Sequence, residues 1–190
     1  MKYRESGMPP VEMWDTFFNP IAILTAMGID KDIDLLVDIG CGYGTFLLPA
    51  AKAIGGRAIG IDVDPKMVEH SARRATELQI DNINFIIDDV SCEASISRLS
   101  KHDHTADYVM LFNMLHCEEP NSLIAKAKQL LKSGGRMGVI HWKHGKTPRG
   151  PSMKIRPTPE VIIGWANESG FALEKRLELP PYHFGLIFKI

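Results

Sequence analysis

The sequence has few cysteines, and they do not form a disulfide or metal-binding pattern. It contains three, Cys41, Cys92 and Cys117, with no Cys-x-x-Cys pair among them. A sparse, odd set of cysteines is typical of reduced thiols in a cytoplasmic protein and argues against a disulfide-stabilised secreted scaffold. We therefore expect a protein whose stability comes from a packed core.

Long apolar runs and a strong net charge are also missing. No apolar stretch approaches the ~18 residues of a membrane span, and residues 1–15 lack the apolar core of a secretory signal. The net charge is −1 and the pI is about 6.7, so bulk charge gives no attraction to nucleic acid or to an anionic membrane. We expect a cytoplasmic protein without a membrane span or nucleic-acid partner, acting on a small molecule. Monomer and homodimer both remain open.

No internal repeat, low-complexity segment or flexible linker divides the chain. Hydrophobic residues make up 45% of the 190 residues, which is ordinary for a chain that buries a core. We expect one domain over residues 1–190. Residues 1–33 would form N-terminal helices that could act as a lid, and residues 34–190 would form the core.

Short apolar runs alternate with helical patterns along most of the chain. Runs without polar alternation predict strands that are buried on both faces, and helices between them predict a parallel sheet. The last two runs have no room for a helix between them and predict an antiparallel pair. The predicted strands are 34–39, 57–62, 83–87, 106–112 and 136–142, followed by the pair in "FALEKRLELP" and "YHFGLIFKI".

Proline and capping residues predict where the helices begin. Asp64-Pro65, Glu119-Pro120 and Thr158-Pro159 each place proline at the first helical position. Pro49 is tolerated only near a helix start, so the first helix after the 34–39 strand should begin around Thr45. The helix from Pro120 should end at the basic, glycine-containing segment 132–135.

The first strand ends in a turn with three glycines, "VDIGCGYG", which includes Gly40, Gly42 and Gly44. Ligands bind at the carboxyl ends of strands in open α/β sheets. Glycine permits positive φ and close approach of the backbone, and the helix that follows offers free N–H groups. Taken alone, the turn is equally compatible with a tight packing turn.

Acidic residues end the next two predicted strands. Asp62 follows the glycine turn by about 20 residues, where an acid can accept both hydroxyls of a ribose. Asp64 is better explained as a helix cap. Asp88 and Asp89 end the third strand and could either contact an adenine edge or cap a helix. All three turns meet at one edge of the predicted sheet.

The motifs together resemble the class I S-adenosylmethionine (SAM)-dependent methyltransferases of small-molecule type, loosely akin to the quinone-biosynthesis branch. The resemblance rests on "VDIGCGYG", "GIDVDP", "FIIDDV", "DYVMLFNMLH", "LLKSGGRMGVIHW" and "TPEVIIGWANESGF", in this order. It implies an α/β fold with a single doubly wound Rossmann-like domain. The sheet would be mostly parallel and seven-stranded, with an antiparallel C-terminal hairpin strand.

The resemblance also implies SAM as the cofactor and a role for each motif. Asp38 and the glycine turn would hold the methionine part, and Asp62 would bind the ribose. Phe17 and Phe18 could contribute to a lid. Val63, Asp89 and Val90 would contact the adenine, and Asn113 would lie near the sulfonium. The cofactor-binding residues implied are Asp38, Gly40, Cys41, Gly42, Gly44, Asp62, Val63, Asp89, Val90 and Asn113.

The implied activity is methyl transfer to a small-molecule acceptor by in-line displacement. A non-catalytic SAM-binding partner or regulatory protein is the alternative, because methyl transfer needs few recognisable catalytic groups. An NAD(P)-dependent oxidoreductase is disfavoured. Its G-x-G-x-x-G spacing is absent, since the glycines lie at 40, 42 and 44 and Thr45 follows. Segment 113–116 is not the Asn/Asp-Pro-Pro-Tyr motif of enzymes that methylate DNA bases.

Three histidines are candidate general bases for an acceptor that must lose a proton. His116 and His144 lie at the ends of the fourth and fifth predicted strands, His183 follows Pro181 near the C-terminal hairpin, and histidine titrates near neutral pH. Each could equally be a surface or capping residue. His102 and His104 lie close together but lack further ligands, so the sequence predicts no metal site.

Segment 143–156 contains five basic residues, namely Lys143, Lys146, Arg149, Lys154 and Arg156. They could attract an anionic acceptor to the pocket mouth. They could equally form a solvated loop in which charge serves solubility.

Overall fold

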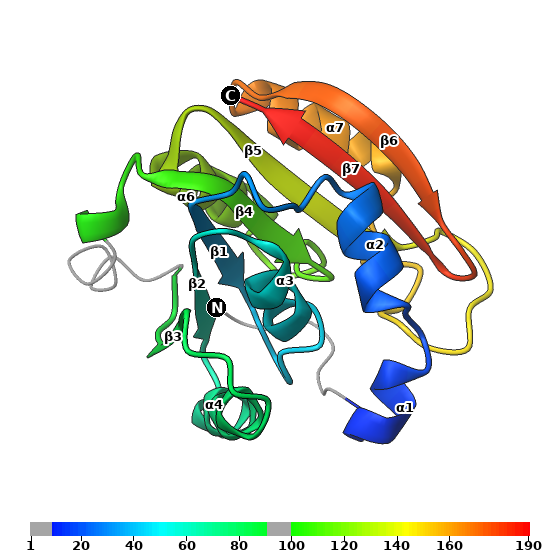
Figure 1. Ribbon diagram of the computed structural model, residues 1–190. Coiled ribbons are helices and arrows are strands. Elements are labelled where there is room, and N and C mark those ends of the chain that lie inside the picture. Colours follow the sequence, from blue (N-terminus) through cyan, green and yellow to red (C-terminus); the bar gives the residue numbers. More distant parts are fainter. Residues whose placement is uncertain (1–8, 91–99) are drawn as a thin grey trace.

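The computed structural model describes residues 9–90 and 100–190, and its centre is a seven-stranded sheet (Figure 1). The strands lie in the order β3-β2-β1-β4-β5-β7-β6. Their bounds are β1 Leu35–Ile39, β2 Arg57–Asp62, β3 Ile83–Ile87, β4 Ala106–Phe112, β5 Leu131–Trp142, β6 Ala172–Leu179 and β7 His183–Lys189.

The strand directions confirm the predicted fold class. β3, β2, β1, β4 and β5 pair in parallel, whereas β7 runs antiparallel between β5 and β6. The expected C-terminal hairpin is therefore present, with β7 paired to β5. The order reverses between β1 and β4, and in open α/β sheets such a switch point is where a ligand binds at the strands' carboxyl ends.

Six α-helices surround the sheet in the part of the chain that the structure describes, with a short 3₁₀ helix at Ser100–His102. Asp64 and Thr158 cap α4 and α7 as predicted, because their side chains accept backbone N–H groups in the first turn. Asn19 caps α2 in the same way. The bounds are α1 Val11–Asp15, α2 Pro20–Ala26, α3 Leu47–Ala53, α4 Pro65–Glu77, α6 Pro120–Leu130 and α7 Pro159–Glu168.

Two boundaries differ from the sequence expectation. α3 begins at Leu47 and not at Thr45, because the turn with positive φ at Gly44 extends to Phe46. α6 gives way directly to β5 at Leu131, so residues 131–135 lie in a strand and not in a glycine-terminated helix. The pairing of β4 with β5 is irregular there, which accommodates the glycines.

The core is divided into two clusters by the sheet. One contains side chains of α6 and α7, including Leu123, Ile124 and Ile162, and the other contains side chains of α2 and α3, including Leu24 and Leu47. Figure 1 shows α2 and α3 on one face of the sheet and α6 and α7 on the other. The doubly wound arrangement is therefore confirmed. Within the described residues, no helix combines the length and hydropathy that a membrane crossing requires.

A buried tyrosine connects the sheet to the N-terminal helices. Tyr108 on β4 donates a hydrogen bond of 2.9 Å to the carbonyl of Met27, at the end of α2. Both residues are essentially inaccessible to solvent. The neighbouring strand leaves room for the ring, since a Cβ on Gly138 would overlap the Tyr108 hydroxyl. Burial raises the pKa of Tyr108, so the hydroxyl stays a donor.

Replacing Tyr108 with phenylalanine should destabilise the protein by about 1–3 kcal/mol, because the Met27 carbonyl would stay buried without its donor. Urea unfolding followed by tryptophan fluorescence measures this change. Tyr182→Phe is the matched control, since Tyr182 is half-buried and packs on Trp142 through its ring. Equal stability of Tyr108→Phe and the control would contradict the assigned role.

Candidate active site

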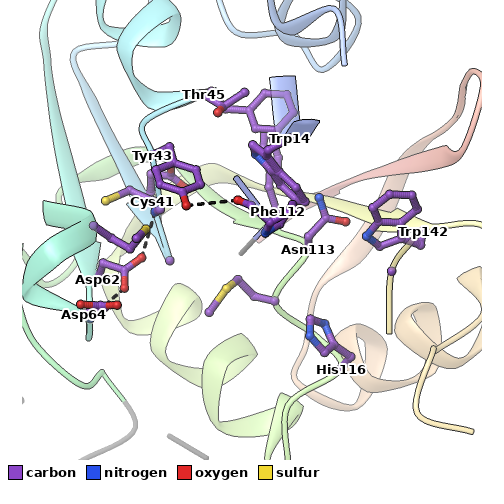
Figure 2. A pocket seen from close by; sticks show the side chains of 18 of the residues that line it. Trp14, Cys41, Tyr43, Thr45, Asp62, Asp64, Phe112, Asn113, His116 and Trp142 are labelled. Carbon is purple, nitrogen blue, oxygen red and sulfur yellow. Dashed lines mark hydrogen bonds between the residues drawn. The ribbon is translucent and has the colours of Figure 1, made fainter. Parts of the chain in front are cut away.

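A cavity of about 650 Å³ opens at the carboxyl ends of the parallel strands. Residues that follow or end β1, β2, β4 and β5 line it, together with residues from the N-terminal segment and from the 143–156 segment. Figure 2 shows Asp62 and Asp64 on one side of the cavity, His116 and Trp142 on the other, and Asn113 between them. Its volume suits a small organic molecule.

The glycine turn after β1 needs glycine at all three positions. Gly40, Gly42 and Gly44 have φ of 81°, 51° and 75°, in the left-handed region that side chains disfavour. A Cβ on Gly40 would also overlap the side chain of Met114. The turn is fastened to β2, because the N–H groups of Gly40 and Cys41 both donate to the carbonyl of Ile61.

Asp62 connects the turns after β1 and β2. One carboxylate oxygen accepts the N–H of Gly42 and the other accepts the N–H of Asp64, each at 2.9 Å. The side chain is 7% exposed, and this burial raises its pKa against the opposing effect of the backbone N–H groups. Asp62 therefore supports the glycine turn as well as facing the cavity.

Asp38 is the second buried carboxylate of the cavity. It lies on β1, is 3% exposed, and accepts no hydrogen bond from any residue in the described ranges 9–90 and 100–190. Burial and the nearby Asp62 raise its pKa to about 8. A cationic ligand group would provide the partner that the described residues do not.

Asn113 lies immediately after β4 with a φ of 59°. Its backbone N–H donates to the carbonyl of Ile140 at 2.7 Å, which fixes it at the end of the strand. Neither atom of its buried side-chain amide finds a hydrogen-bond partner among the described residues. Because an unsatisfied buried amide is costly, this group fits a polar ligand in the cavity.

Most of the other residues expected around the cofactor line either the cavity or a small hollow next to it. Cys41 lines the cavity, and burial raises its thiol pKa. Val63, Asp89 and Val90 line a small adjacent hollow that also borders on Gly40, Asp62 and Met114. Gly44 lines neither space; its carbonyl accepts the N–H of Leu48 and begins α3.

The three candidate histidines lie in different surroundings. His116 lines the cavity, whereas His144 and His183 do not. The Nδ1 of His144 lies 3.0 Å from the carbonyl oxygen of Arg156. His183 is buried between Phe18 and Trp142, with ring centroids at 4.5 and 4.2 Å. Burial, assisted by nearby cations, lowers its pKa to about 3.

Sequence reasoning missed the aromatic side of the cavity. Trp14 from α1, Phe112 at the end of β4 and Trp142 at the end of β5 all line it. Phe17 and Phe18, which the sequence suggested for a lid, do not line the cavity; their rings pack on Trp142 and Phe46. The positions of Phe112 and Trp142 at predicted strand ends were an available signal; that of Trp14 was not.

Comparison with known proteins agrees with this geometry. A family model described as a methyltransferase domain matches residues 36–135, just over half of the chain. Over 105 residues the chain is 30% identical to aklanonic acid methyltransferase DauC of Streptomyces sp. (strain C5), covering 54% of this chain and 45% of that protein. The chain spans less than half the length of the curated relatives it matches first.

Two solved structures share the fold over nearly the whole chain. A SAM-dependent methyltransferase from Aquifex aeolicus superposes with a TM-score of 0.82 at 20% identity, covering 97% of this chain and all of the other. A putative type 11 methyltransferase from Sulfolobus solfataricus gives 0.68 at 26% identity, covering 91% and 92%.

The chain belongs to the methyltransferase domain family. Its fold is that of the class I SAM-dependent methyltransferases, and SAM is the cofactor of that class. The residues fit this cofactor, since the cavity offers a buried amide without a hydrogen-bond partner among the described residues, a buried carboxylate for a cation and a second carboxylate beside a glycine turn.

The buried state of His183 predicts a specific pH dependence of stability. Its folded pKa of about 3 lies below the ordinary 6.5, so the unfolded chain binds a proton that the folded chain does not. Above pH 6.5 His183 is neutral in both states and does not alter the stability. Below pH 6.5 its effect lowers the free energy of unfolding by up to about 1.4 kcal/mol per pH unit as the pH drops toward 3.

Urea unfolding between pH 7 and 4 tests this dependence. His183→Phe should have a shallower loss of stability on acidification than the natural sequence. His104→Asn, at an exposed position with positive φ that asparagine tolerates, should retain the original slope. Parallel slopes for all three proteins would show that His183 is not buried in its neutral form.

Proposed function

We propose that this protein binds SAM in the cavity and transfers its methyl group to a small-molecule acceptor. The observation that carries the proposal is the pair of buried carboxylates, Asp38 and Asp62, on either side of a turn with positive φ at all three glycines. The family match and the name of its curated relative, an aklanonic acid methyltransferase, support transfer to a small molecule.

In this proposal each buried polar group has a complementary part of the cofactor. The Asp38 carboxylate would accept hydrogen bonds from the α-ammonium, which is the cation that its environment lacks. Each oxygen of Asp62 already accepts one N–H and has capacity for one ribose hydroxyl. The Asn113 amide would satisfy its hydrogen bonds on the methionine part, and Val63, Asp89 and Val90 would enclose the adenine.

Bound SAM supplies a methyl group on a positively charged sulfur, which leaves as a neutral thioether. The protein therefore mainly aligns the acceptor and excludes water, and alignment alone can contribute about 7–11 kcal/mol. Trp14, Phe112 and Trp142 would provide the apolar walls for this purpose. His116, the candidate histidine that lines the cavity, would accept a proton from an acceptor that must lose one.

The domain organisation and location expected from the sequence are part of the same proposal. Residues 34–190 would form the cofactor-binding core, and α1 and α2 would act as a lid, which the position of Trp14 at the cavity supports. Cys41 and Cys117 are free thiols, in keeping with a cytoplasmic location. The near-neutral charge favours a small acceptor over nucleic acid.

Titration with SAM and with its demethylated product, S-adenosylhomocysteine, tests the first step by calorimetry. Both should bind, and Asp62→Ala should weaken both by at least about tenfold, because it removes the ribose acceptor and loosens the glycine turn. Labelled methyl transfer into a metabolite extract then separates an enzyme from a non-catalytic binder. Absence of binding by either compound would overturn the proposal.

The raised pKa of Asp38 predicts that cofactor binding releases a proton. The carboxyl is mostly protonated below pH 8, and pairing with an ammonium requires its ionised form. The affinity for S-adenosylhomocysteine should therefore rise by up to about tenfold per pH unit between pH 6 and 8 and level off above 8.

Calorimetry in buffers of different ionisation enthalpy at pH 6.5 counts the released proton directly. Asp38→Asn should bind more weakly, without a pH dependence and without proton release. Asp81→Asn, at an exposed position away from the cavity, is the matched control and should behave like the natural sequence. A pH-independent affinity in the natural protein would rule out this role for Asp38.

A further inference from the structure

Charge is distributed unevenly around the cavity. Asp38, Asp62 and Asp64 lie around the glycine turn and the start of α4. Arg149, from the segment after β5, is the one lysine or arginine among the lining residues that the structure describes. Its guanidinium takes part in no hydrogen bond or ion pair within residues 9–90 and 100–190. Asp38 and Asp62 are assigned to the cofactor and Asp64 caps α4, but nothing in the proposed function uses Arg149.

Arg149 is held at the cavity by a buried neighbour. Arg156 is 7% exposed, and its guanidinium donates to the carbonyls of Lys143, Gly145 and Pro151, at 2.9, 3.1 and 2.6 Å. It also donates to the hydroxyl of Thr147 at 2.9 Å. One side chain thus fixes the backbone on both sides of Arg149. The backbone of the segment is therefore held in place, while the side chains of Lys146, Arg149 and Lys154 are exposed.

The segment that contains Arg149 also packs directly on Trp142, one of the aromatic residues that line the cavity. Gly150 has a φ of 108°, and a Cβ there would lie within 2.8 Å of the Trp142 ring. Trp142 is itself buttressed by Phe17 and His183, with ring centroids at 5.4 and 4.2 Å. Arg149 therefore stands beside a rigid aromatic surface, with Trp14 and Phe112 completing the apolar lining (Figure 2 shows the three rings).

We infer that the methyl acceptor is a flat, largely apolar molecule with one anionic group, bound between these aromatic rings with its anion on Arg149. This inference rests on the proposed function and specifies its substrate class. The rings provide flat apolar surface, which favours a planar molecule. The guanidinium provides a forked donor for a carboxylate.

Calorimetry with two matched probes tests this substrate class. The anionic probe is 2-naphthoate and its neutral counterpart is 2-naphthamide, each titrated into the protein with and without saturating S-adenosylhomocysteine. The naphthoate should bind about tenfold more tightly than the amide, and added salt should reduce its advantage because Arg149 is exposed to solvent.

Variants assign the effect to the residues named. Arg149→Gln should abolish the preference for naphthoate by weakening that probe alone, and Arg149→Lys should restore part of it. Lys146→Gln, in the same segment but not lining the cavity, should keep the full preference. Trp14→Leu should weaken both probes to a similar extent, because it removes aromatic surface and no charge.

Equal affinities for the two probes, or no binding of either, would overturn the inference. So would a loss of preference in Lys146→Gln as large as that in Arg149→Gln. Failure of S-adenosylhomocysteine to bind is a different result, since it contradicts the proposed function. The probe titrations without it still report on the acceptor site.

Discussion

The cavity depends above all on the Asp62 carboxylate, which holds two turns of the chain together. One oxygen accepts an N–H from the glycine turn after β1, and the other accepts an N–H at the start of the turn after β2. Ser71 on α4 reinforces the same turn by donating to the carbonyl of Gly42 at 2.7 Å. The backbone can therefore keep positive φ at Gly40, Gly42 and Gly44 and form the floor of the cavity. Without the hydrogen bonds of Asp62, the glycine backbone could adopt other conformations.

Features with a local cause could be predicted from the sequence. Strands buried on both faces read as unbroken apolar runs, and helices that begin at Asp64-Pro65 and Thr158-Pro159 contain both the cap and the proline that define their start. The positions of Asp38, Asp62 and Asn113 at the cavity could also be predicted, because each lies at or near the end of a predicted strand. In a parallel sheet the carboxyl ends of neighbouring strands meet at one edge, so a polar residue at each end enters the same space.

Features that depend on distant contacts could not be predicted. Trp14 lines the cavity next to Phe17, whose ring packs on Trp142 and Tyr182, and no local pattern specifies these contacts. The sequence suggested Phe17 and Phe18 for a lid and did not single out Trp14. The same limit applies to His183, whose partners Phe18 and Trp142 come from opposite ends of the chain. Arg156 is a further case, because a run of five basic residues does not show which one is buried.

The polar groups of the cavity lower the stability of the protein without its ligand. Asp38 is buried beside a second carboxylate and stays protonated at neutral pH, and the amide of Asn113 finds no partner among the described residues. Such groups cost about 1–3 kcal/mol each when unsatisfied. A ligand that pairs with the Asp38 carboxyl and the Asn113 amide therefore removes this cost, and its binding also stabilises the folded chain. The site is consequently preorganised for a cation flanked by hydrogen-bonding groups at one side, while the aromatic side near Arg149 carries the opposite charge preference. In the proposed reaction, two ligands of complementary charge would thus bind in one cavity and be aligned for in-line transfer between them.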